Sequence, residues 1–496
     1  MNARMILPAL TEARGPYWRS LKYSLFPPLG LATLAGHFDR DTDVSLTDEH
    51  VEPLRLDDRP DLVILEVYAT SARRAYAIAD TYRRRGVRVA MGGLHVTTCP
   101  REALGHADHI FLGPGDDTFP RFLHDLARGR ARRVYRSRVR RLDGLPPPRR
   151  DLIHRHRYLV PNVVVASRGC PHHCDFCYKD SFYRGGRSYY TAPVDAVLAE
   201  IDALPGRHVF FLDDHLFGHR RFAEALLDGL RGMGRVWQAG GTVQSVLAPG
   251  LMEKAADAGL RSLFVGFETL NAQGLSEQGK VHNLGRDYDL AARRLHDLGI
   301  MINASFVFGT DADDPSVFDR TVHWAVRAGI ETATFHILTP YPGTALYRRM
   351  AAQGRLLHRN WDLYDTRHAV YRPARMRPSE LECGYWRAYR DFYACGAILR
   401  AAATKPTVAG MLRHLAYSGA WKKLDALWGW LIRSQGLPLA VPALEFVLSR
   451  GRSRQAEPVA PRRPAEGKNV RSERPPSLWP LKPPSGSLAE AYKYIV

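Results

Sequence analysis

Short apolar runs alternate with amphipathic stretches along most of the chain, and this alternation predicts parallel α/β architecture. In the first part of the chain a strand and a helix recur every ~20–30 residues, the spacing of a doubly wound sheet with right-handed crossovers. The expected strands are 5–8, 44–48, 62–67, 87–91 and 110–112, and the expected helices are 28–38, 72–85 and 118–128. The pattern therefore predicts an N-terminal Rossmann-like sheet.

The alternation resumes after residues 130–150, a basic connector that contains three consecutive prolines. Strands are expected at 162–167, 208–212, 236–239, 262–267, 302–308 and 332–338, with helices at 193–204, 219–231, 248–258, 286–298 and 315–328. These units are too few for a closed eight-unit barrel, so the pattern predicts a central partial (β/α)6 barrel of the TIM type.

The last part of the chain has a helical pattern, with helices expected at 380–399, 407–415 and 421–432. Residues 452–487 are rich in Pro, Arg, Ser and Glu, which predicts disorder. The expected units are a Rossmann-like domain (1–135), a linker (136–158), a partial barrel (159–375), a helical extension (376–450) and a mostly disordered tail (451–496). Within the third unit, the aromatic and polar residues 361–375 predict a rim that leads out of the barrel.

The formal net charge is +19, from 70 Lys and Arg against 51 Asp and Glu, and it admits three interpretations: a nucleic-acid face, contact with an anionic membrane, or an Arg-rich composition without such a partner. Arginine is spread along the whole chain and is not interleaved with aromatic residues, which favours the third. The longest apolar run, 427–448, contains Arg433 and Glu445, so no membrane span is expected there. No signal peptide is recognised at Met1, and a reducing cytoplasm is expected.

Three cysteines carry the clearest chemical signal, because Cys170, Cys174 and Cys177 form a C-x3-C-x2-C spacing directly after the apolar run 163–166. A tetrahedral zinc site needs a fourth ligand, whereas a cubane iron–sulfur cluster can be held through three irons with the fourth left open. The spacing therefore favours an open-site [4Fe-4S] cluster. Its place after an expected strand agrees with ligand binding at the carboxyl ends of parallel strands.

With Phe176 before the third cysteine, this motif resembles that of the radical S-adenosylmethionine (radical SAM) superfamily. The resemblance implies that SAM binds the open iron and is cleaved to a 5'-deoxyadenosyl radical, so no catalytic side chain is assigned. The residues that it places near SAM are Phe176, Asp213, Asp214, Glu268 and Gly309. For the two aspartates, a helix cap remains the alternative to a SAM contact.

Glycine-containing turns follow the strands of the first domain, where glycine permits close approach to a large ligand. Their order resembles the cobalamin-binding domain that precedes many radical SAM domains, and the implied cobalamin contacts are Ser71, Gly92, Gly93, His95, Gly113 and Gly115. Many such domains carry a cobalt-binding histidine after the first strand, but residues 8–15 contain none, so no histidine is expected below cobalt. His95 is expected to be a hydrogen-bonding wall residue. A degenerate domain that binds nothing is the alternative.

The C-terminal helices resemble an extension found in one branch of cobalamin-dependent radical SAM proteins, which implies that they cover the substrate opening. Trp421, Trp428 and Trp430 lie near several Lys and Arg residues. They form either an interfacial surface for a membrane or the aromatic contact of a helical cap with the barrel.

These resemblances together predict an enzyme that methylates an unactivated carbon of a small-molecule or lipid substrate. Its expected cofactors are a [4Fe-4S] cluster, SAM and cobalamin, and its expected electron donor is a flavodoxin or ferredoxin. One alternative keeps these cofactors but cyclises, rearranges or oxidises the substrate. Another is a basic iron–sulfur protein that binds RNA, although no nucleic-acid partner is expected; peripheral membrane contact stays open.

Overall fold

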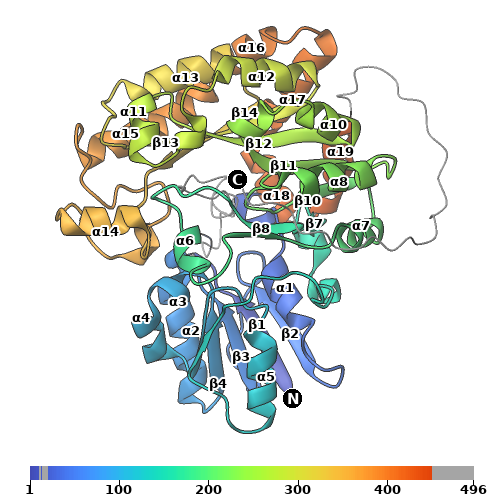
Figure 1. Ribbon diagram of the computed structural model, residues 1–496, viewed down its shortest axis with the longest axis vertical. Coiled ribbons are helices and arrows are strands. Elements are labelled where there is room, and N and C mark those ends of the chain that lie inside the picture. Colours follow the sequence, from blue (N-terminus) through green and yellow to red (C-terminus); the bar gives the residue numbers. More distant parts are fainter. Residues whose placement is uncertain (11–12, 14–20, 450–496) are drawn as a thin grey trace, which may run out of the picture.

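The computed structural model describes residues 1–10, 13 and 21–449, so the predicted disordered segment 452–487 lies outside the described residues. Two parallel six-stranded sheets organise the chain. Figure 1 shows the N-terminal domain in blue beneath the barrel in green and yellow, with β8 (Ser167–Gly169) and α6 (Lys179–Phe182) between them.

The N-terminal sheet has the strand order β2-β1-β3-β4-β5-β6, and all of its pairs are parallel. Its strands are β1 (Asn2–Leu7), β2 (Asp43–Asp48), β3 (Leu62–Glu66), β4 (Arg88–Gly92), β5 (His109–Leu112) and β6 (Val134–Arg136). Its helices are α1 (Leu29–Ala35), α2 (Ala72–Arg84), α3 (Leu94–Thr98), α4 (Pro100–His106) and α5 (Phe119–Ala127). The chain leaves β1 toward β2 and then crosses to β3 on the other side, so the topological switch point lies beside β1.

Continuous apolar runs explain why this sheet is buried on both faces. In β3, the four residues from Leu62 to Leu65 are all buried. One apolar cluster lies against α2, whose buried side chains recur at helical spacing, and a second lies against α1 and α5. The predicted Rossmann-like domain is confirmed.

The second sheet has the order β14-β13-β12-β11-β10-β7, again wholly parallel and in an unbroken series. Its strands are β7 (Val163–Val164), β10 (His208–Phe211), β11 (Val236–Thr242), β12 (Leu260–Glu268), β13 (Met301–Phe308) and β14 (Thr332–Ile337). Its helices are α7 (Val194–Asp202), α8 (Arg220–Leu230), α9 (Val243–Val246), α10 (Leu251–Asp257), α11 (Ala272–Glu277), α12 (Tyr288–Asp297), α13 (Val317–Arg327) and α14 (Ala345–Ala352). The predicted partial (β/α)6 barrel is confirmed.

Several elements differ from the prediction, and helices α3, α4, α11 and α14 and the later helix α19 (Val441–Ser449) were not predicted. The expected strand 162–167 is split, because β7 joins the barrel while β8 pairs in antiparallel orientation with β9 (Tyr189–Thr191). The cysteines therefore lie between β8 and β9 and do not directly follow the barrel strand β7; residues 166–178, which include β8 and the three cysteines, form the cysteine loop. The connector 130–150 also begins with β6, an edge strand of the first sheet. The expected helix 380–399 is broken in two.

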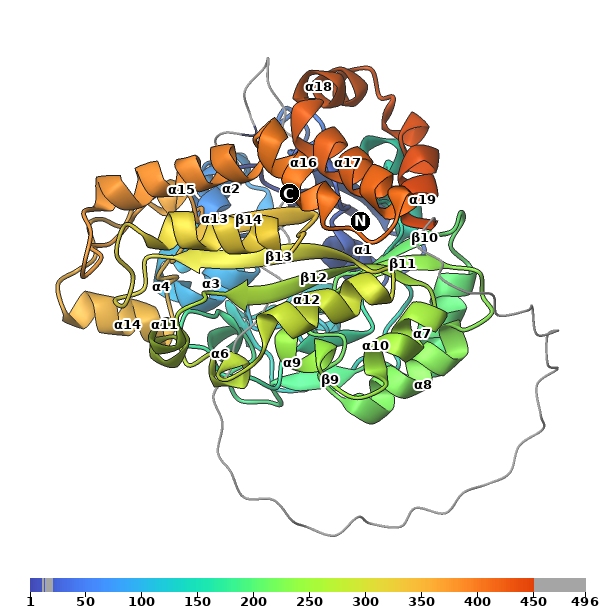
Figure 2. The same ribbon diagram turned by 90° about the horizontal axis from the view of Figure 1, so that it is seen from above.

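The helical extension contains α15 (Pro378–Phe392), α16 (Cys395–Ala403), α17 (Val408–Lys423), α18 (Asp425–Arg433) and α19 (Val441–Ser449). The turn between α16 and α17, α17 itself and α19 contact the amino ends of the barrel strands: Lys405 of the turn binds Glu331 just before β14, Ser418 of α17 donates to the carbonyl oxygen of Glu331, and Glu445 of α19 accepts from the backbone N–H of His208 at the start of β10. Figure 2 shows these helices gathered along one side of the barrel.

Helix α18 takes a different position from the rest of the extension. Leu431 on α18 and Leu437 just after it share an apolar cluster with Phe210 and Phe264 of the barrel strands. Contacts of α18 also reach residues 21–24 of the first domain. Coverage of a substrate opening by the extension stays a prediction; within the described chain, α18 and its following turn are a part of the extension whose contacts reach the first domain.

The predicted rim 361–375 packs against the first domain. Its short helix Trp361–Leu363 contacts α2, and Trp361 shares an apolar cluster with the side chains of that domain. Among the described residues, no helix combines the length and the apolar character needed to cross a membrane.

Candidate functional site

A crevice lies between the carboxyl edge of the N-terminal sheet and the cysteine loop, and it has two chambers. The Gly92 chamber lies at the carboxyl ends of β3, β4 and β5. Its empty volume is about 1210 Å³, which includes space open to solvent. The His50 chamber follows β1, β2 and β3 and encloses about 1120 Å³ on the same measure. Both are lined by Leu29, Gly30, Glu66, Tyr68 and Val165. The second chamber lies at the topological switch point, where doubly wound sheets bind ligands.

Gly30 and Gly92 line these chambers at positions where neither the backbone conformation nor close packing requires glycine. A Cβ atom at Gly30 would lie 3.7 Å from the carboxylate oxygens of Glu66, and one at Gly92 would lie 3.5 Å from the Phe111 side chain, which are ordinary contacts. Neither residue has a positive φ. A longer side chain at either position would fill chamber space, so the cradle fits a large ligand such as a corrin.

Three other glycines at this edge are required by a positive φ or by close packing. Gly93 has φ 107°, and a Cβ there would lie 2.7 Å from the carbonyl oxygen of Val67. Gly113 has φ 82°, and a Cβ at Gly115 would lie 2.9 Å from Leu34 of α1. These three residues line the Gly92 chamber, whereas the predicted contact Ser71 lines the His50 chamber.

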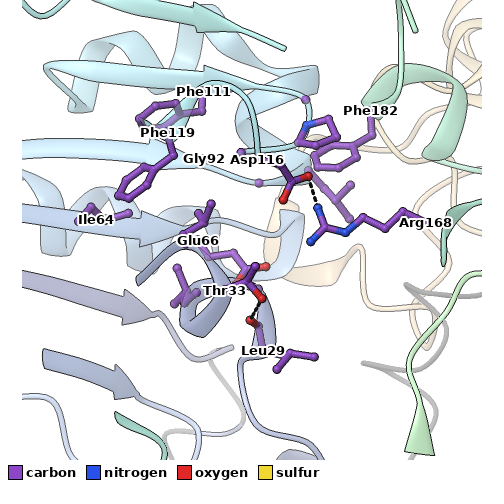
Figure 3. Close-up of a pocket in the computed structure, with 18 of the residues that line it drawn as sticks. Leu29, Thr33, Ile64, Glu66, Gly92, Phe111, Asp116, Phe119, Arg168 and Phe182 are labelled. Carbon is purple, nitrogen blue, oxygen red and sulfur yellow. Dashed lines mark hydrogen bonds and ion pairs between the residues drawn. The ribbon is translucent and has the colours of Figure 1, made fainter. Parts of the chain in front are cut away.

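An ion pair that is largely buried on the Asp116 side joins the two domains at the Gly92 chamber. Arg168 of β8 donates to Asp116, which follows Gly115 in the first domain, as Figure 3 shows. Burial alone would lower the pKa of Arg168, but the charge of Asp116 raises it, so the guanidinium stays charged. Tyr178 and Phe182 line the same chamber. Tyr178, which is next to Cys177, and Arg168, two residues before Cys170, therefore border the glycine-lined space.

The three cysteines Cys170, Cys174 and Cys177 are all buried in one loop. Burial raises the pKa of Cys170 to about 11 and that of Cys174 well above its usual value, so these thiols need a positive partner to ionise. Three such thiols match the ligand set of an open-site cluster. Lys179 supports the loop, since its buried ammonium donates to the carbonyl oxygens of Cys170 at 2.8 Å and His172 at 2.6 Å.

The two aspartates predicted near SAM bind the cysteine loop in this structure. Asp213 accepts from the backbone N–H of Ala166 at 3.1 Å and from the N–H and hydroxyl of Ser167. Asp214 accepts from the N–H of Gly169 at 2.8 Å and from the hydroxyl of Tyr178 at 2.8 Å. Burial raises the pKa of Asp213 to about 7. Neither carboxylate forms the alternative helix cap; each fixes backbone or side chains that flank the iron ligands.

Glu268 ends β12 with an unusual backbone, at φ 66° beside a register shift in the pairing with β13. Such a conformation is strained for a residue other than glycine and is typical of functional sites. The carboxylate accepts from the ammonium of Lys280, and both side chains are buried. Burial would lower the pKa of Lys280, but the charge of Glu268 raises it. The pair lies close enough to Cys174 for their charges to interact.

The other two predicted SAM contacts have different surroundings. Phe176 is half-buried and packs against the barrel core. Gly309 closes β13 with φ 99°, and its carbonyl oxygen accepts from the Tyr371 hydroxyl. A Cβ at Gly309 would meet that hydroxyl at 2.4 Å. Glycine is thus required here by close packing with residues that follow the barrel.

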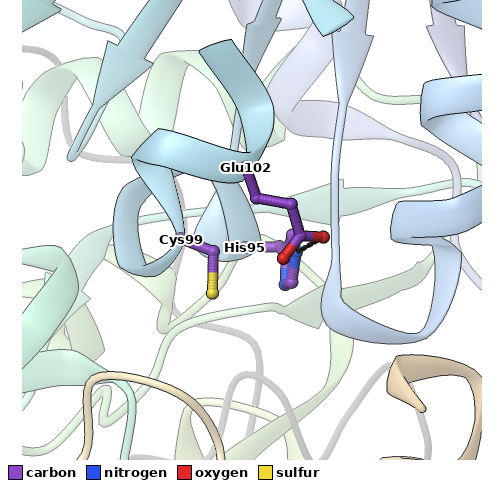
Figure 4. Close-up of side chains that lie close together, drawn as sticks. All are labelled: His95, Cys99 and Glu102. Carbon is purple, nitrogen blue, oxygen red and sulfur yellow. Dashed lines mark hydrogen bonds and ion pairs between the residues drawn. The ribbon is translucent and has the colours of Figure 1, made fainter. Parts of the chain in front are cut away.

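His95 does not line either chamber. Its buried ring lies 3.4 Å from Glu102, and Trp361 donates to both oxygens of Glu102 at 3.2 Å. The potential ligand atoms of His95, Cys99 and Glu102 lie within 4.8 Å of one another, as Figure 4 shows, so these residues could hold a metal ion. The hydrogen-bonding role predicted for His95 therefore lies at the contact between α3, α4 and the segment that follows the barrel, and not in the wall of either chamber.

Sequence reasoning did not find Arg168, Asp116 or Lys280. Asp116 directly follows the predicted glycine turn, and Arg168 precedes the cysteine motif by two residues. Both therefore lie beside motifs that can be recognised in the sequence. Their pairing spans 52 residues, and no spacing rule connects them.

Comparison with known proteins agrees with this geometry. Residues 23–123 match the B12 binding domain family, and residues 164–344 match the Radical SAM superfamily. Bacteriochlorophyllide d C-12(1)-methyltransferase of Chlorobaculum tepidum is 29% identical over 392 residues, covering 76% of this chain and 85% of that protein. The hopanoid C-2 methylase of Rhodopseudomonas palustris is 26% identical over 380 residues, covering 71% and 70%.

A solved structure shares the fold. The radical S-adenosylmethionine methyltransferase TsrM from Kitasatospora setae, with cobalamin and a [4Fe-4S] cluster bound, superposes with a TM-score of 0.57 at 16% identity. The superposition covers 87% of this chain and 99% of that one. The barrel and its cysteine loop thus define a radical SAM protein. The chain belongs to those radical SAM proteins that carry a B12-binding domain before the barrel, and its cofactors are a [4Fe-4S] cluster, SAM and cobalamin.

Proposed function

We propose that the chain is a cobalamin-dependent radical SAM enzyme that methylates an unactivated carbon of a small-molecule or lipid substrate. When bound, the cluster and SAM supply a 5'-deoxyadenosyl radical that abstracts hydrogen, and methylcobalamin supplies the methyl group. One observation carries this proposal: the glycine-lined chamber of the B12-binding domain is also lined by Arg168 and Tyr178 of the cysteine loop. The two proposed cofactor sites would therefore border one cavity.

The protein side chains would act by holding and orienting the cofactors. Cys170, Cys174 and Cys177 would bind three irons, and Asp213 and Asp214 would fix the loop that carries them. Ser71 and the turns at Gly92, Gly93, Gly113 and Gly115 would form the cobalamin contact. Phe176, Glu268 and Gly309 remain proposed SAM contacts, with Glu268 acting together with Lys280.

The names of the curated relatives support methylation at carbon. One relative is named a bacteriochlorophyllide d C-12(1)-methyltransferase and the other a hopanoid C-2 methylase, and both names give the position of the carbon that is methylated. A methylated carbon in a small-molecule or lipid substrate is therefore the product that the proposed function expects.

The decisive experiment uses SAM with a deuterated methyl group. Anaerobically reconstituted protein with cobalamin and candidate substrates is expected to release 5'-deoxyadenosine and to form a product whose mass includes the deuterated methyl. Cys174→Ala should abolish both, while Cys383→Ala, which changes an exposed cysteine on α15, should abolish neither. Deoxyadenosine release with a product that lacks added methyl mass would favour cyclisation, rearrangement or oxidation instead.

We also propose that a flavodoxin or ferredoxin reduces the cluster in a reducing cytoplasm, because an open cluster of this kind works at low potential. Replacing the chemical reductant in the assay by reduced flavodoxin tests this. Product formation with reduced flavodoxin or reduced ferredoxin supports the proposal. The absence of product with both carriers contradicts it.

Peripheral contact with a membrane is proposed for α18, where Leu427 and Trp430 are exposed apolar side chains. Co-sedimentation with anionic vesicles is expected for the full chain. It should be reduced several-fold in a Leu427→Ser, Trp430→Ser double variant. Sedimentation that does not change would contradict the role of α18.

A further inference from the structure

Three side chains with different metal-binding groups meet where α3 and α4 join. His95 lies on α3, Cys99 between the helices and Glu102 on α4. Helical hydrogen bonds continue across the join, since the N–H of Cys99 donates to the carbonyl oxygen of His95 at 2.8 Å and its carbonyl oxygen accepts from Ala103 at 3.2 Å. Residues three and four apart therefore share one side of this segment. One ligand atom from each of the three side chains lies within 4.8 Å of the others.

Hydrogen bonds within this cluster leave the imidazole of His95 poorly satisfied. The side chain is 0% exposed, and its Nε2 lies 3.4 Å from Glu102, as Figure 4 shows. Nδ1 is buried and has no hydrogen-bond partner in the part of the chain that the structure describes. Polar atoms that leave water usually gain another contact, so a buried ring nitrogen without one points to a missing ligand.

Cys99 supplies the softest of the three donors. Burial, together with the charge of Glu102, raises the pKa of this thiol to about 11, so the thiol stays protonated until a positive charge lies beside it. A bound divalent metal provides that charge and displaces the proton. Thiolate, imidazole and carboxylate in one cluster are ligands that zinc accepts at tetrahedral sites.

Trp361 orients the carboxylate from the far side of the domain contact. Its indole N–H donates to both oxygens of Glu102 at 3.2 Å, and its ring meets the His95 ring edge-on at a centroid distance of 5.4 Å. Carboxylates that bind metals are typically held by such outer hydrogen bonds. The Glu102 side chain is 38% exposed, so water can reach the cluster and complete four-fold coordination.

We propose that His95, Cys99 and Glu102 bind one zinc ion, whose fourth ligand is water. The ion fixes α3 and α4 against Trp361 and so ties the first domain to the segment that follows the barrel. Because α3 begins directly after Gly93, the ion also steadies the glycine turn at the crevice. The inference does not depend on the proposed function, since no residue of the cysteine loop takes part and His95 lines neither chamber.

The zinc content of the full chain tests this without relying on activity. Anaerobically reconstituted protein, with its cluster in place, is given one equivalent of zinc, desalted and analysed by mass spectrometry of the metals. Retention of the zinc is expected. X-ray absorption at the zinc edge, which is separate from the iron and cobalt edges, is expected to show one sulfur among nitrogen and oxygen ligands.

Three variants assign the ligands. Cys99→Ala is expected to lose zinc on desalting, whereas Cys395→Ala, which changes an exposed cysteine on α16, should retain it. Trp361→Phe keeps an aromatic ring but removes the donor to Glu102. It is expected to weaken zinc binding by about 10–100-fold in competition with a chelator.

Each other result overturns the assignment. No zinc in the desalted wild type would mean that the three side chains form only a hydrogen-bonded cluster. Three sulfurs at the zinc edge would place the ion on the cysteine loop, and no sulfur would place it on the surface. Retention by Cys99→Ala would assign another site, and unchanged affinity in Trp361→Phe would remove the tie to the segment after the barrel. The wild-type spectrum answers even where a variant folds poorly.

Discussion

Single carboxylates hold the cysteine loop in place. The oxygens of Asp214 accept from Gly169, next to Cys170, and from Tyr178, next to Cys177. One buried side chain therefore fixes both ends of the motif. Removing it would leave two buried donors without an acceptor, and each such group costs about 1–3 kcal/mol.

The first prediction concerns cluster content. Asp214→Ala is expected to reduce the iron and sulfide retained per chain several-fold after anaerobic reconstitution, measured by colorimetric assay and by visible absorbance. Asp143→Ala changes an exposed aspartate that pairs with Arg141 in the linker and should leave the content unchanged. Full cluster occupancy in Asp214→Ala would show that the loop is fixed by other contacts.

A second prediction at this scale concerns Glu268 and Lys280. Removing one partner of a buried ion pair leaves an uncompensated charge, so Glu268→Gln and Lys280→Met are each expected to lower the free energy of unfolding by about 3–5 kcal/mol. The double variant should lose less than the sum of the two. Anaerobic urea unfolding measures all three.

The exposed pair Arg294 and Glu253 provides the control for this cycle. Glu253→Gln is expected to change the free energy of unfolding by about 0–1 kcal/mol. Strictly additive effects of Glu268→Gln and Lys280→Met would contradict the energetic coupling of the pair.

The cysteine motif was readable from the sequence because its ligands are contiguous. The roles of Asp213 and Asp214 were not, since the partners named above lie 36 to 47 residues away and only the folded barrel brings them together. The sequence placed both aspartates at the correct strand end. It could not show whether their carboxylates face a cofactor or the loop beside it.

At the scale of elements, the alternation of strands and helices predicted both sheets. Strands β10 and β13 were clear because every residue in β10 is buried and all but His208 are apolar, and because most residues in β13 are apolar and buried. Edge strand β6 was missed because only its central residue, Tyr135, is buried. Helices α15 and α16 were predicted as one, because Tyr393 and Ala394 interrupt the helix without a proline or glycine.

The extension depends on one buried cluster at the amino end of β14. Lys405 donates to Glu331 and, at 2.6 Å, to the carbonyl oxygen of Gly329, while His296 lies 3.3 Å from Glu331. Burial would raise the pKa of Glu331, but His296 and Lys405 hold it well below its usual value. A carboxyl group with a lowered pKa in the folded state stabilises the protein above its unfolded pKa and loses this contribution as the pH falls.

Lys405→Met is therefore expected to shift acid unfolding to higher pH, because the folded-state pKa of Glu331 rises toward or above its unfolded value. The loss of helical circular dichroism on titration from neutral pH measures the midpoint. Lys254→Met, which changes a lysine paired with the exposed Asp228, should leave the midpoint unchanged. An unshifted midpoint in Lys405→Met would contradict this account.

At the scale of the whole molecule, the crevice lies between the two domains. The domains contact each other through the segment 361–375 and through the ion pair between Arg168 and Asp116. Since Arg168 is mostly shielded from solvent, Asp116→Asn would leave its charge without this counter-ion. This variant is expected to be cleaved by trypsin within the linker 136–158 several-fold faster than the wild type, as measured by gel densitometry. Asp151→Asn, at an exposed pair with Arg149, should not be affected, and equal cleavage rates for Asp116→Asn would contradict coupling through this pair.

The position of Arg168 also bears on how the enzyme tolerates air. Arg168 lies two residues before Cys170. A movement of the domains that breaks the contact between Arg168 and Asp116 would therefore also displace the backbone beside an iron ligand. A substrate that entered by parting the domains would open the cluster to dioxygen in every catalytic cycle. Entry that leaves this ion pair intact avoids that exposure, so inactivation by oxygen should be no faster during turnover than at rest.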